Sequence, residues 1–378
     1  LYKDVVIFDF RSLYPTIISS HNIGPGSFKN KDFATSKSEK TVVPGREKYW
    51  FSDKKAFLPL ILTDLITIRQ ELKKEIKEEK NKGKDTGYLE ARSYAIKTLA
   101  NSFYGYLGFY GARWYSIESA ASTTAFARHY IKTTIEKAKE IGFKVIYADT
   151  DSCFLVLDGK TLEDGMRFMD EVNKDLPGVM ELEYEGHFPS GIFVAQKGSS
   201  KGAKKRYALL REDGTLKITG FELVRRNTTA FVKVLQEEVL RLVLQNKVED
   251  AINYVRGKIQ DLLNNKVKNE ELVLKTQLTR PLEKYKSIGP HVLVAQKMKD
   301  KDYLITVGML IEYIIGEGTG IVRERAHMST ELAEGKYDSD YYLHHHVLPA
   351  VTQIFTVLGV SEESLVGKPE QKGLGAFM

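Results

Sequence analysis

Aspartates at the ends of two apolar runs are the most direct sign of chemistry in this chain. Asp9 ends the first run, and Asp149 and Asp151 follow the second. A carboxylate at the end of a buried strand faces a cleft from a rigid base and offers the oxygen ligands that Mg²⁺ prefers. Two such ions, about 3.5–4 Å apart, clamp the attacking and leaving oxygens of a phosphoryl displacement. Alternation along a strand would place Asp149 and Asp151 on one face, with Thr150 opposite. Alone, Asp-Thr-Asp is equally typical of a capped turn.

A basic segment lies between the two carboxylate segments. Lys97 and Asn101 are four residues apart, followed by an aromatic residue and a glycine, so these side chains share one helical face. A second helical pattern carries Arg69 and Lys73 at the same spacing, although a charge-rich exposed helix would look similar. Chemistry on a nucleoside triphosphate needs both kinds of group. Carboxylate-held metal neutralises the phosphates, and a basic helix positions them for in-line attack.

Three segments, in this order, resemble the A, B and C motifs of the family B DNA polymerases, most closely the archaeal replicative enzymes. They are Asp9–Pro15, Lys97–Gly105 and Tyr147–Ser152, and the resemblance covers nearly all 378 residues. It implies transfer of dNMP from a dNTP to the 3′-hydroxyl of a DNA primer on a template, with release of pyrophosphate. It also implies two Mg²⁺ ions, for which Mn²⁺ can substitute. A catalytically inactive homologue that binds primer-template, or another palm-type nucleotidyltransferase such as a reverse transcriptase, remains open.

The resemblance assigns roles to the motif residues. Asp9 and Asp151 are expected to share the metal ions, with Asp149 in a supporting role and the Phe10 carbonyl completing one coordination shell. Lys97 is expected to donate a proton to the leaving pyrophosphate. The expected dNTP contacts are Ser12, Leu13, Tyr14, Arg69, Lys73, Lys97 and Asn101, and the expected nascent base-pair contacts are Asn101, Tyr104 and Gly105.

Tyr14 has a second expected role. In the family, an aromatic ring at this position lies beneath the sugar and excludes a 2′-hydroxyl, so the resemblance implies a preference for deoxynucleotides. Core packing beneath the neighbouring helices is the simpler alternative for Tyr14.

Basic clusters after the carboxylates resemble segments that bind duplex DNA in the family. Lys204–Tyr207 resembles a stretch that holds the primer, and Gly220–Arg226 resembles the lead into the thumb, although Asn227-Thr228 replaces the usual Asp-Trp. Each cluster taken alone also fits a solvated basic face. The expected DNA contacts are Thr150, Lys204, Lys205, Arg206, Tyr207, Arg225, Arg226, Thr279, Arg280 and Tyr285.

The last eight residues resemble the short clamp-binding peptide of replication proteins. One helical turn would place Leu374 and Phe377 on one face as an apolar plug, with Gln371 at the rim. Met378 stands where a second aromatic residue is usual. We expect a sliding clamp as partner, and an ordinary frayed terminus is the alternative.

Composition limits the classes of protein to which this chain can belong. The formal charge of +6 permits a nucleic-acid partner, no run of 18 apolar residues is present, and the single cysteine excludes an internal disulfide framework. The resemblance implies a cytoplasmic, nucleoid-associated protein. The carboxylate motifs of the exonuclease half that accompanies this module in the family are not found, so we expect that half to be absent from this chain.

The expected fold is α+β, a right-hand polymerase with a carboxylate-bearing palm sheet, an inserted helical hairpin as fingers and a mostly helical thumb. Helices are expected over 56–80, 89–109, 118–141, 162–175, 228–246, 248–263, 269–276 and 340–358, with hairpins at 143–157 and 207–219. Residues 24–54 read as an extended connection with little core. The expected divisions are palm 1–54, fingers 55–109, palm 110–226, thumb 227–368 and clamp-binding tail 369–378.

Overall fold

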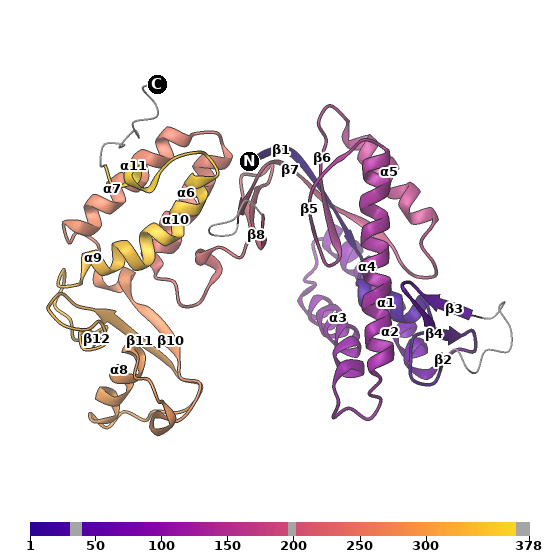
Figure 1. Cartoon of the computed structure of the whole chain (residues 1–378), viewed down its shortest axis with the longest axis horizontal. Helices are drawn as coiled ribbons and strands as arrows, with labels where there is room; N and C mark the ends of the chain where they lie inside the picture. Colours follow the sequence, from indigo (N-terminus) through magenta and orange to yellow (C-terminus); the bar gives the residue numbers. More distant parts are fainter. Residues whose placement is uncertain (31–39, 196–201, 368–378) are drawn as a thin grey trace. The chain divides into compact units, whose positions relative to one another are not determined.

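The computed structural model describes residues 1–30, 40–195 and 202–367, which form two compact units (Figure 1). The N-terminal unit is Asp4–His187, and the C-terminal unit combines Leu1–Lys3 with Phe188–Met378. Each unit contains its own cluster of buried apolar side chains. Two strands, β1 (Tyr2–Phe10) and β7 (Leu182–Ala195), pass from one unit into the other. Among the described helices, none combines the length and apolar character that crossing a bilayer requires.

The N-terminal unit is built on a short antiparallel sheet. Strand β6 (Ser152–Val156) pairs with β1 on one side and with β5 (Lys144–Asp149) on the other. The apolar run of β1 is buried without alternation, as expected for a strand covered on both faces. Helix α4 (Ile117–Glu140) packs on β5 and β6, and α5 (Leu162–Lys174) lies beside it. The expected hairpin with carboxylates at its tip is confirmed.

Two long helices form the expected helical hairpin. Helix α2 (Phe57–Asn81) and helix α3 (Gly87–Gly108) pack against each other, and the short helix α1 (Leu13–Ser20) contacts both (Figure 1). The apolar side chains of α2 recur at helical spacing and face this contact, while its second half is charged and exposed. Gly83, at a φ of +70°, lies in the connection between the helices.

A three-stranded sheet occupies much of the segment that the sequence suggested was a connection with little core. The strands are β2 (Phe28–Asn30), β3 (Lys40–Val43) and β4 (Arg46–Ser52), in the order β2-β4-β3. The expected extended connection was wrong because lysines and glutamates interrupt the apolar residues of these strands and hide their alternation in the sequence. Phe51 is nevertheless fully buried in the main core of the unit.

The C-terminal unit begins with an antiparallel meander. Strand β7 pairs with β8 (Gly202–Leu210), and β8 pairs with β9 (Leu216–Thr219), which confirms the hairpin expected at 207–219. A 3₁₀ turn, Glu222–Val224, leads into α6 (Ala230–Leu244) and α7 (Val248–Leu263). Thr229 caps α6 by accepting a hydrogen bond from the Val232 amide.

The remainder of this unit is less helical than expected. A second sheet joins β10 (Leu274–Gln277), β11 (Leu310–Ile315) and β12 (Ala326–Met328), with α8 (Pro290–Lys299) packed on it. The helix expected over 269–276 is wrong: a 3₁₀ turn, Asn269–Leu272, precedes β10, and all four residues of β10 pair with the distant strand β11. The unit also contains a short 3₁₀ turn (Leu282–Lys284), a one-turn helix, α11 (Glu362–Leu365), and one longer helical segment. That segment comprises α9 (Ser339–Tyr342), a π-helical turn (Leu343–Val347) and α10 (Leu348–Thr356).

Candidate active site

The turn between β5 and β6 places one carboxylate into a cavity. Asp149 pairs with Ser152 as the last pair of the ladder, so Thr150 and Asp151 form the turn itself. Thr150 has a φ of 51°, a left-handed conformation that β-branched residues rarely adopt. The alternation expected along a continuous strand therefore does not apply here. Asp151 and Thr150 line the cavity, whereas Asp149 is not among the residues that line it.

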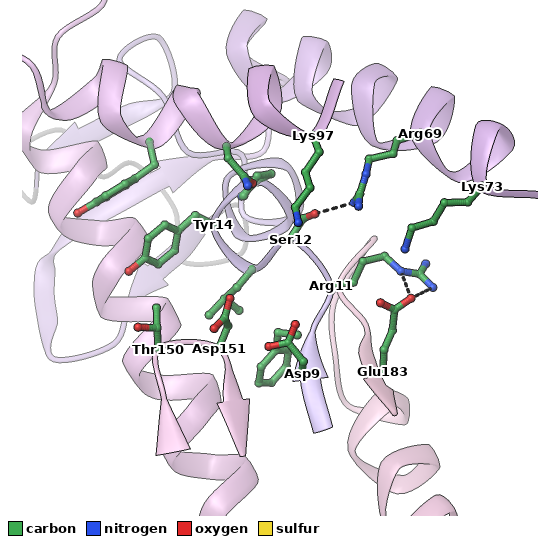
Figure 2. Close-up of a pocket in the computed structure, with 15 residues that line it drawn as sticks. Asp9, Arg11, Ser12, Tyr14, Arg69, Lys73, Lys97, Thr150, Asp151 and Glu183 are labelled. Atoms are coloured by element: carbon green, nitrogen blue, oxygen red, sulfur yellow. Dashed lines mark hydrogen bonds and ion pairs between the residues drawn. The ribbon is translucent and has the colours of Figure 1, made fainter. Parts of the chain in front are cut away.

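Asp9 reaches the same cavity from the neighbouring strand. It lies opposite Ser152 in the β1–β6 ladder, and the Phe10 amide donates a 2.8 Å hydrogen bond to the Asp151 carbonyl. The Asp9 carboxylate at the end of β1 and the Asp151 carboxylate in the β5–β6 turn thus face one space, as Figure 2 shows, and its volume is about 620 Å³. Both are partly buried, which places their charges where solvent screens them less than on an open surface.

Four cations line the cavity, three of them on the helices opposite these carboxylates. Lys97 projects from α3, Arg69 and Lys73 project from α2, and Arg11 follows β1 (Figure 2). Burial lowers the pKa of Lys73 from its usual value, Glu183 opposes that shift, and the nearby cations reinforce it. Burial likewise lowers the pKa of Arg69, whose buried Nε finds no hydrogen-bond partner among the residues that the structure describes. This concentration of positive charge is suited to a polyanion.

The start of α1 contributes to the same wall. Ser12 precedes the helix with a φ of 48° and makes no side-chain cap; its Oγ instead accepts a 3.1 Å hydrogen bond from Arg69 Nη1. Ser12, Leu13 and Tyr14 all line the cavity at the helix N-terminus, where amide groups favour a bound anion. The Tyr14 ring contacts that of Tyr104 on α3, with centroids 4.5 Å apart.

Two charged residues that line the cavity, Arg11 and Glu183, were not anticipated from the sequence. Arg11 Nε donates to Glu183 Oε1 at 2.5 Å, and Arg11 Nη1 pairs with Glu181 at 2.5 Å. The Arg11 amide also donates to the Glu181 carbonyl at 2.9 Å. The alternating pattern Glu-Leu-Glu-Tyr-Glu over 181–185 is the signal that could have indicated a strand with carboxylates on one face.

The structure brings most of the expected nucleotide contacts together. Those that line the cavity are Asp9, Phe10, Ser12, Leu13, Tyr14, Arg69, Lys73, Lys97, Asn101, Tyr104, Thr150 and Asp151. Asp149 and Gly105 are absent from this wall among the described residues. Gly105 is exposed, and apart from its chain neighbours and the backbone of its own helix, no described atom lies within 4 Å of the position that a Cβ would take there.

The donor set of the cavity suits a hard divalent cation. Asp9 and Asp151 supply carboxylates, and Phe10 supplies a carbonyl in the same wall, so every offered ligand is oxygen. The described residues include no cluster of three or more His, Cys, Asp or Glu arranged to hold a metal. Mg²⁺ does not need one, because it retains water and takes further oxygens from substrate phosphates.

The expected DNA contacts beyond Thr150 lie in the C-terminal unit. Lys204, Lys205, Arg225 and Arg226 are exposed, whereas Tyr207 is buried in β8. Arg206 Nη2 donates a 2.7 Å hydrogen bond to Glu222, and burial lowers the pKa of Arg206.

A second group of these contacts lies around one tyrosine. Tyr285 accepts from the Thr279 amide at 2.9 Å and lies 5.4 Å from the Arg280 guanidinium. Thr279 and Arg280 are exposed, so both are available to a ligand. The expected clamp-binding residues Gln371, Leu374, Phe377 and Met378 lie outside the described residues.

Comparison with known proteins identifies a family for this chain. Residues 1–358 match the family model for DNA polymerase family B. The chain is 39% identical over its whole length to a DNA polymerase of Thermococcus gorgonarius, covering 48% of that protein, and 34% identical to one of Archaeoglobus fulgidus, also covering 48%. A solved family B polymerase of Pyrobaculum calidifontis superposes with a TM-score of 0.71 at 31% identity, over 95% of this chain and 46% of that one. The chain thus spans about half the length of the relatives it matches.

Proposed function

Because the chain belongs to DNA polymerase family B, we propose that it catalyses template-directed transfer of dNMP from a dNTP to a primer 3′-hydroxyl. The observation that carries this proposal is the single cavity in which Asp9 and Asp151 face Arg69, Lys73 and Lys97. One wall offers oxygen ligands and the other offers cations, the combination required for a metal-bound triphosphate. Two Mg²⁺ ions, replaceable by Mn²⁺, would be held by Asp9, Asp151 and the Phe10 carbonyl, with Asp149 in support, and would supply Lewis-acid charge neutralisation.

The side chains of the cavity divide the remaining work. Arg69, Lys73 and the amides at the start of α1 bind the triphosphate and align its α-phosphorus with the primer oxygen. The primer 3′-hydroxyl loses its proton to solvent, and its oxygen forms a bond to the α-phosphorus as the bond from the α-phosphorus to the oxygen that bridges it to the β-phosphate breaks. Lys97 donates its proton to the departing pyrophosphate, whose negative charge grows in the transition state.

The base and sugar of the nucleotide would contact the aromatic part of the wall. Asn101 and Tyr104, with Gly105 beyond them on α3, form the surface against which the nascent base pair stacks. Tyr14 lies beneath the sugar and excludes a 2′-hydroxyl.

In this proposal the remaining elements take the positions usual in the family. The sheet β5-β6-β1 and its helices are the palm, α2 and α3 are the fingers, and the C-terminal unit from 227 onward is the thumb. Lys204, Lys205, Arg225, Arg226 and Arg280 contact the phosphates of primer-template DNA, which requires no sequence preference. A sliding clamp binds Gln371–Met378, a proposal that deleting 371–378 and measuring clamp-stimulated synthesis would test.

Primer extension by the 378-residue chain tests the function directly. DNA and RNA templates are each supplied with dNTPs or NTPs in the presence of Mg²⁺. We expect extension on DNA with dNTPs only. Binding of primer-template without extension would indicate an inactive homologue, and preferred use of the RNA template would indicate a reverse transcriptase.

A further inference from the structure

A second cavity lies at the other end of the helical hairpin, in the N-terminal unit. Its volume is about 750 Å³, and it is formed by the start of α2, the end of β4 and the loop after α3. Phe57, Leu58 and Trp114 provide apolar walls, and Lys29, Lys54 and Lys55 are among the lining residues. The described residues that line it include no carboxylate. Nothing in the proposed chemistry uses this cavity.

One buried asparagine fixes the lysine-bearing wall. Asn22 Nδ2 donates to the carbonyls of Ser52 and Lys54 at 2.6 and 2.8 Å, and its Oδ1 accepts from the Ala56 amide at 2.9 Å. The segment 52–56 is therefore held along its length before any ligand arrives. Preorganisation of this kind lowers the cost of binding.

The aromatic walls are unusually exposed for their size. Phe57 is 61% exposed and Trp114 is 41% exposed, with ring centroids 6.2 Å apart. The Arg113 guanidinium lies over the Trp114 ring at 5.3 Å. Exposed aromatic rings next to cations are the combination that binds single-stranded nucleic acid, because bases stack on the rings while lysines contact the phosphates.

The direction of the hairpin identifies which nucleotide would arrive. Along α3 the order is Lys97, then Tyr104, then the helix end at Gly108, followed by Trp114. Helix α2 runs from Phe57 at the second cavity to Arg69 and Lys73 at the first. In the proposed function the phosphates lie near Lys97 and the nascent base pair near Tyr104. With the nascent base pair at Tyr104, the end of α3 is where the proposed function would place the template strand that is not yet paired.

We propose that this second cavity binds an unpaired nucleotide of the template strand, ahead of the position being copied. The base stacks on Trp114 and Phe57, and the adjoining phosphates contact Lys54, Lys55 and Lys29. This inference rests on the proposed function for the identity of the strand, but its chemistry, an aromatic base with an anionic backbone, follows from the cavity itself.

The test measures binding, without dNTP or metal, of two DNA probes: a blunt duplex and the same duplex with a 5′ template overhang of oligothymidylate. The unsubstituted chain should bind the overhang probe more tightly. Trp114→Ala should weaken binding of the overhang probe by about tenfold and leave blunt-duplex binding unchanged. Trp114→Phe is the matched control and should retain most of the affinity. The double variant Lys54→Ala/Lys55→Ala should bind the overhang probe more weakly, and its affinity for that probe should depend less on salt concentration.

Tryptophan fluorescence provides a second readout. The chain has two tryptophans, and Trp50 is buried, so quenching by an oligothymidylate of about 12 nucleotides should disappear in Trp114→Phe. The inference would be overturned if Trp114→Ala lost as much affinity for the blunt duplex as for the overhang probe. It would also be overturned if neither Trp114→Ala nor Lys54→Ala/Lys55→Ala lost affinity for the overhang probe. Thymidine monophosphate quenching as strongly as the oligonucleotide would also overturn it, since the cavity would then bind free nucleotide. Failure of the proposed function would appear elsewhere, as absent extension by a chain that still shows Trp114-dependent binding.

Discussion

The ring of Tyr14 on α1 lies 4.5 Å, centroid to centroid, from the ring of Tyr104 on α3, with their planes inclined at 43°. The contact joins α1, the short helix after the first carboxylate strand, to the helix that bears Lys97. Aromatic pairs of this geometry stabilise by about 0.5–1.5 kcal/mol beyond the area they bury. Tyr14 is thereby held in one orientation at the cavity wall, a requirement for any residue that selects by steric exclusion.

Tyr14→Ala should relax sugar selection. Without the ring, space beneath the sugar admits a 2′-hydroxyl, and the preference for dNTP over NTP should fall by about tenfold or more. Competing incorporation of dNTP and NTP on a DNA template measures this ratio. Tyr14→Phe retains the ring and should behave as the unsubstituted chain. An unchanged ratio in Tyr14→Ala would leave Tyr14 as core packing only.

Asp9→Ala and Asp151→Ala should each abolish extension while leaving primer-template affinity largely intact, because these carboxylates hold metal rather than DNA. Single-turnover extension and equilibrium DNA binding are measured on the same preparations. Asp158→Ala, on an exposed residue just after β6, is the control. Extension within about tenfold of the unsubstituted chain in either aspartate variant would exclude the metal assignment.

Lys97→Ala should lower turnover by about 10²–10³-fold, since it removes a charge and a proton donor that act mainly in the transition state. Lys74→Ala, on an exposed residue outside both cavities, serves as the control. Burst kinetics separate turnover from DNA affinity. A defect confined to DNA affinity would place Lys97 outside the chemistry.

Burial lowers the pKa of Lys73 and the Glu183 carboxylate limits that shift, which gives dNTP binding a pH dependence. The pKa of Lys73 is below its usual value, and Lys73 must be protonated to bind phosphate, so dNTP affinity falls as the pH rises through that pKa. Glu183 raises this pKa. Glu183→Gln should therefore move the alkaline midpoint of dNTP binding to lower pH, while strengthening binding below the midpoint. Lys73→Arg should remove the midpoint altogether, and a midpoint that moves upward in Glu183→Gln would contradict the assignment.

Sequence patterns predicted which helical side chains share a face better than they predicted the sheets around them. Lys97 and Asn101, or Arg69 and Lys73, share a face because helical spacing alone decides it, and all four line one cavity. Strand β10 was missed because its partner β11 is distant in sequence. The small sheet containing Phe51 was missed because charged residues mask the alternation of its strands. The Asp149–Asp151 geometry was misjudged because the left-handed φ of Thr150 converts a strand into a turn, which no periodicity reports. Glu183 was missed because its only mark was a short alternation.

The β1–β6 ladder has a consequence for how this chain acquires activity. It joins Asp9 to the turn that carries Asp151, so α1, the small sheet, the helical hairpin and α4 all lie in the loop that this pairing closes. Closing so long a loop is slow, whereas the α2–α3 hairpin needs only local contacts. During synthesis on a ribosome, the catalytic pair cannot assemble until β6 has emerged. In refolding from denaturant we expect helical circular dichroism to recover in a faster phase than binding of a fluorescent dNTP, and recovery of both in one phase would show that the ladder forms with the helices.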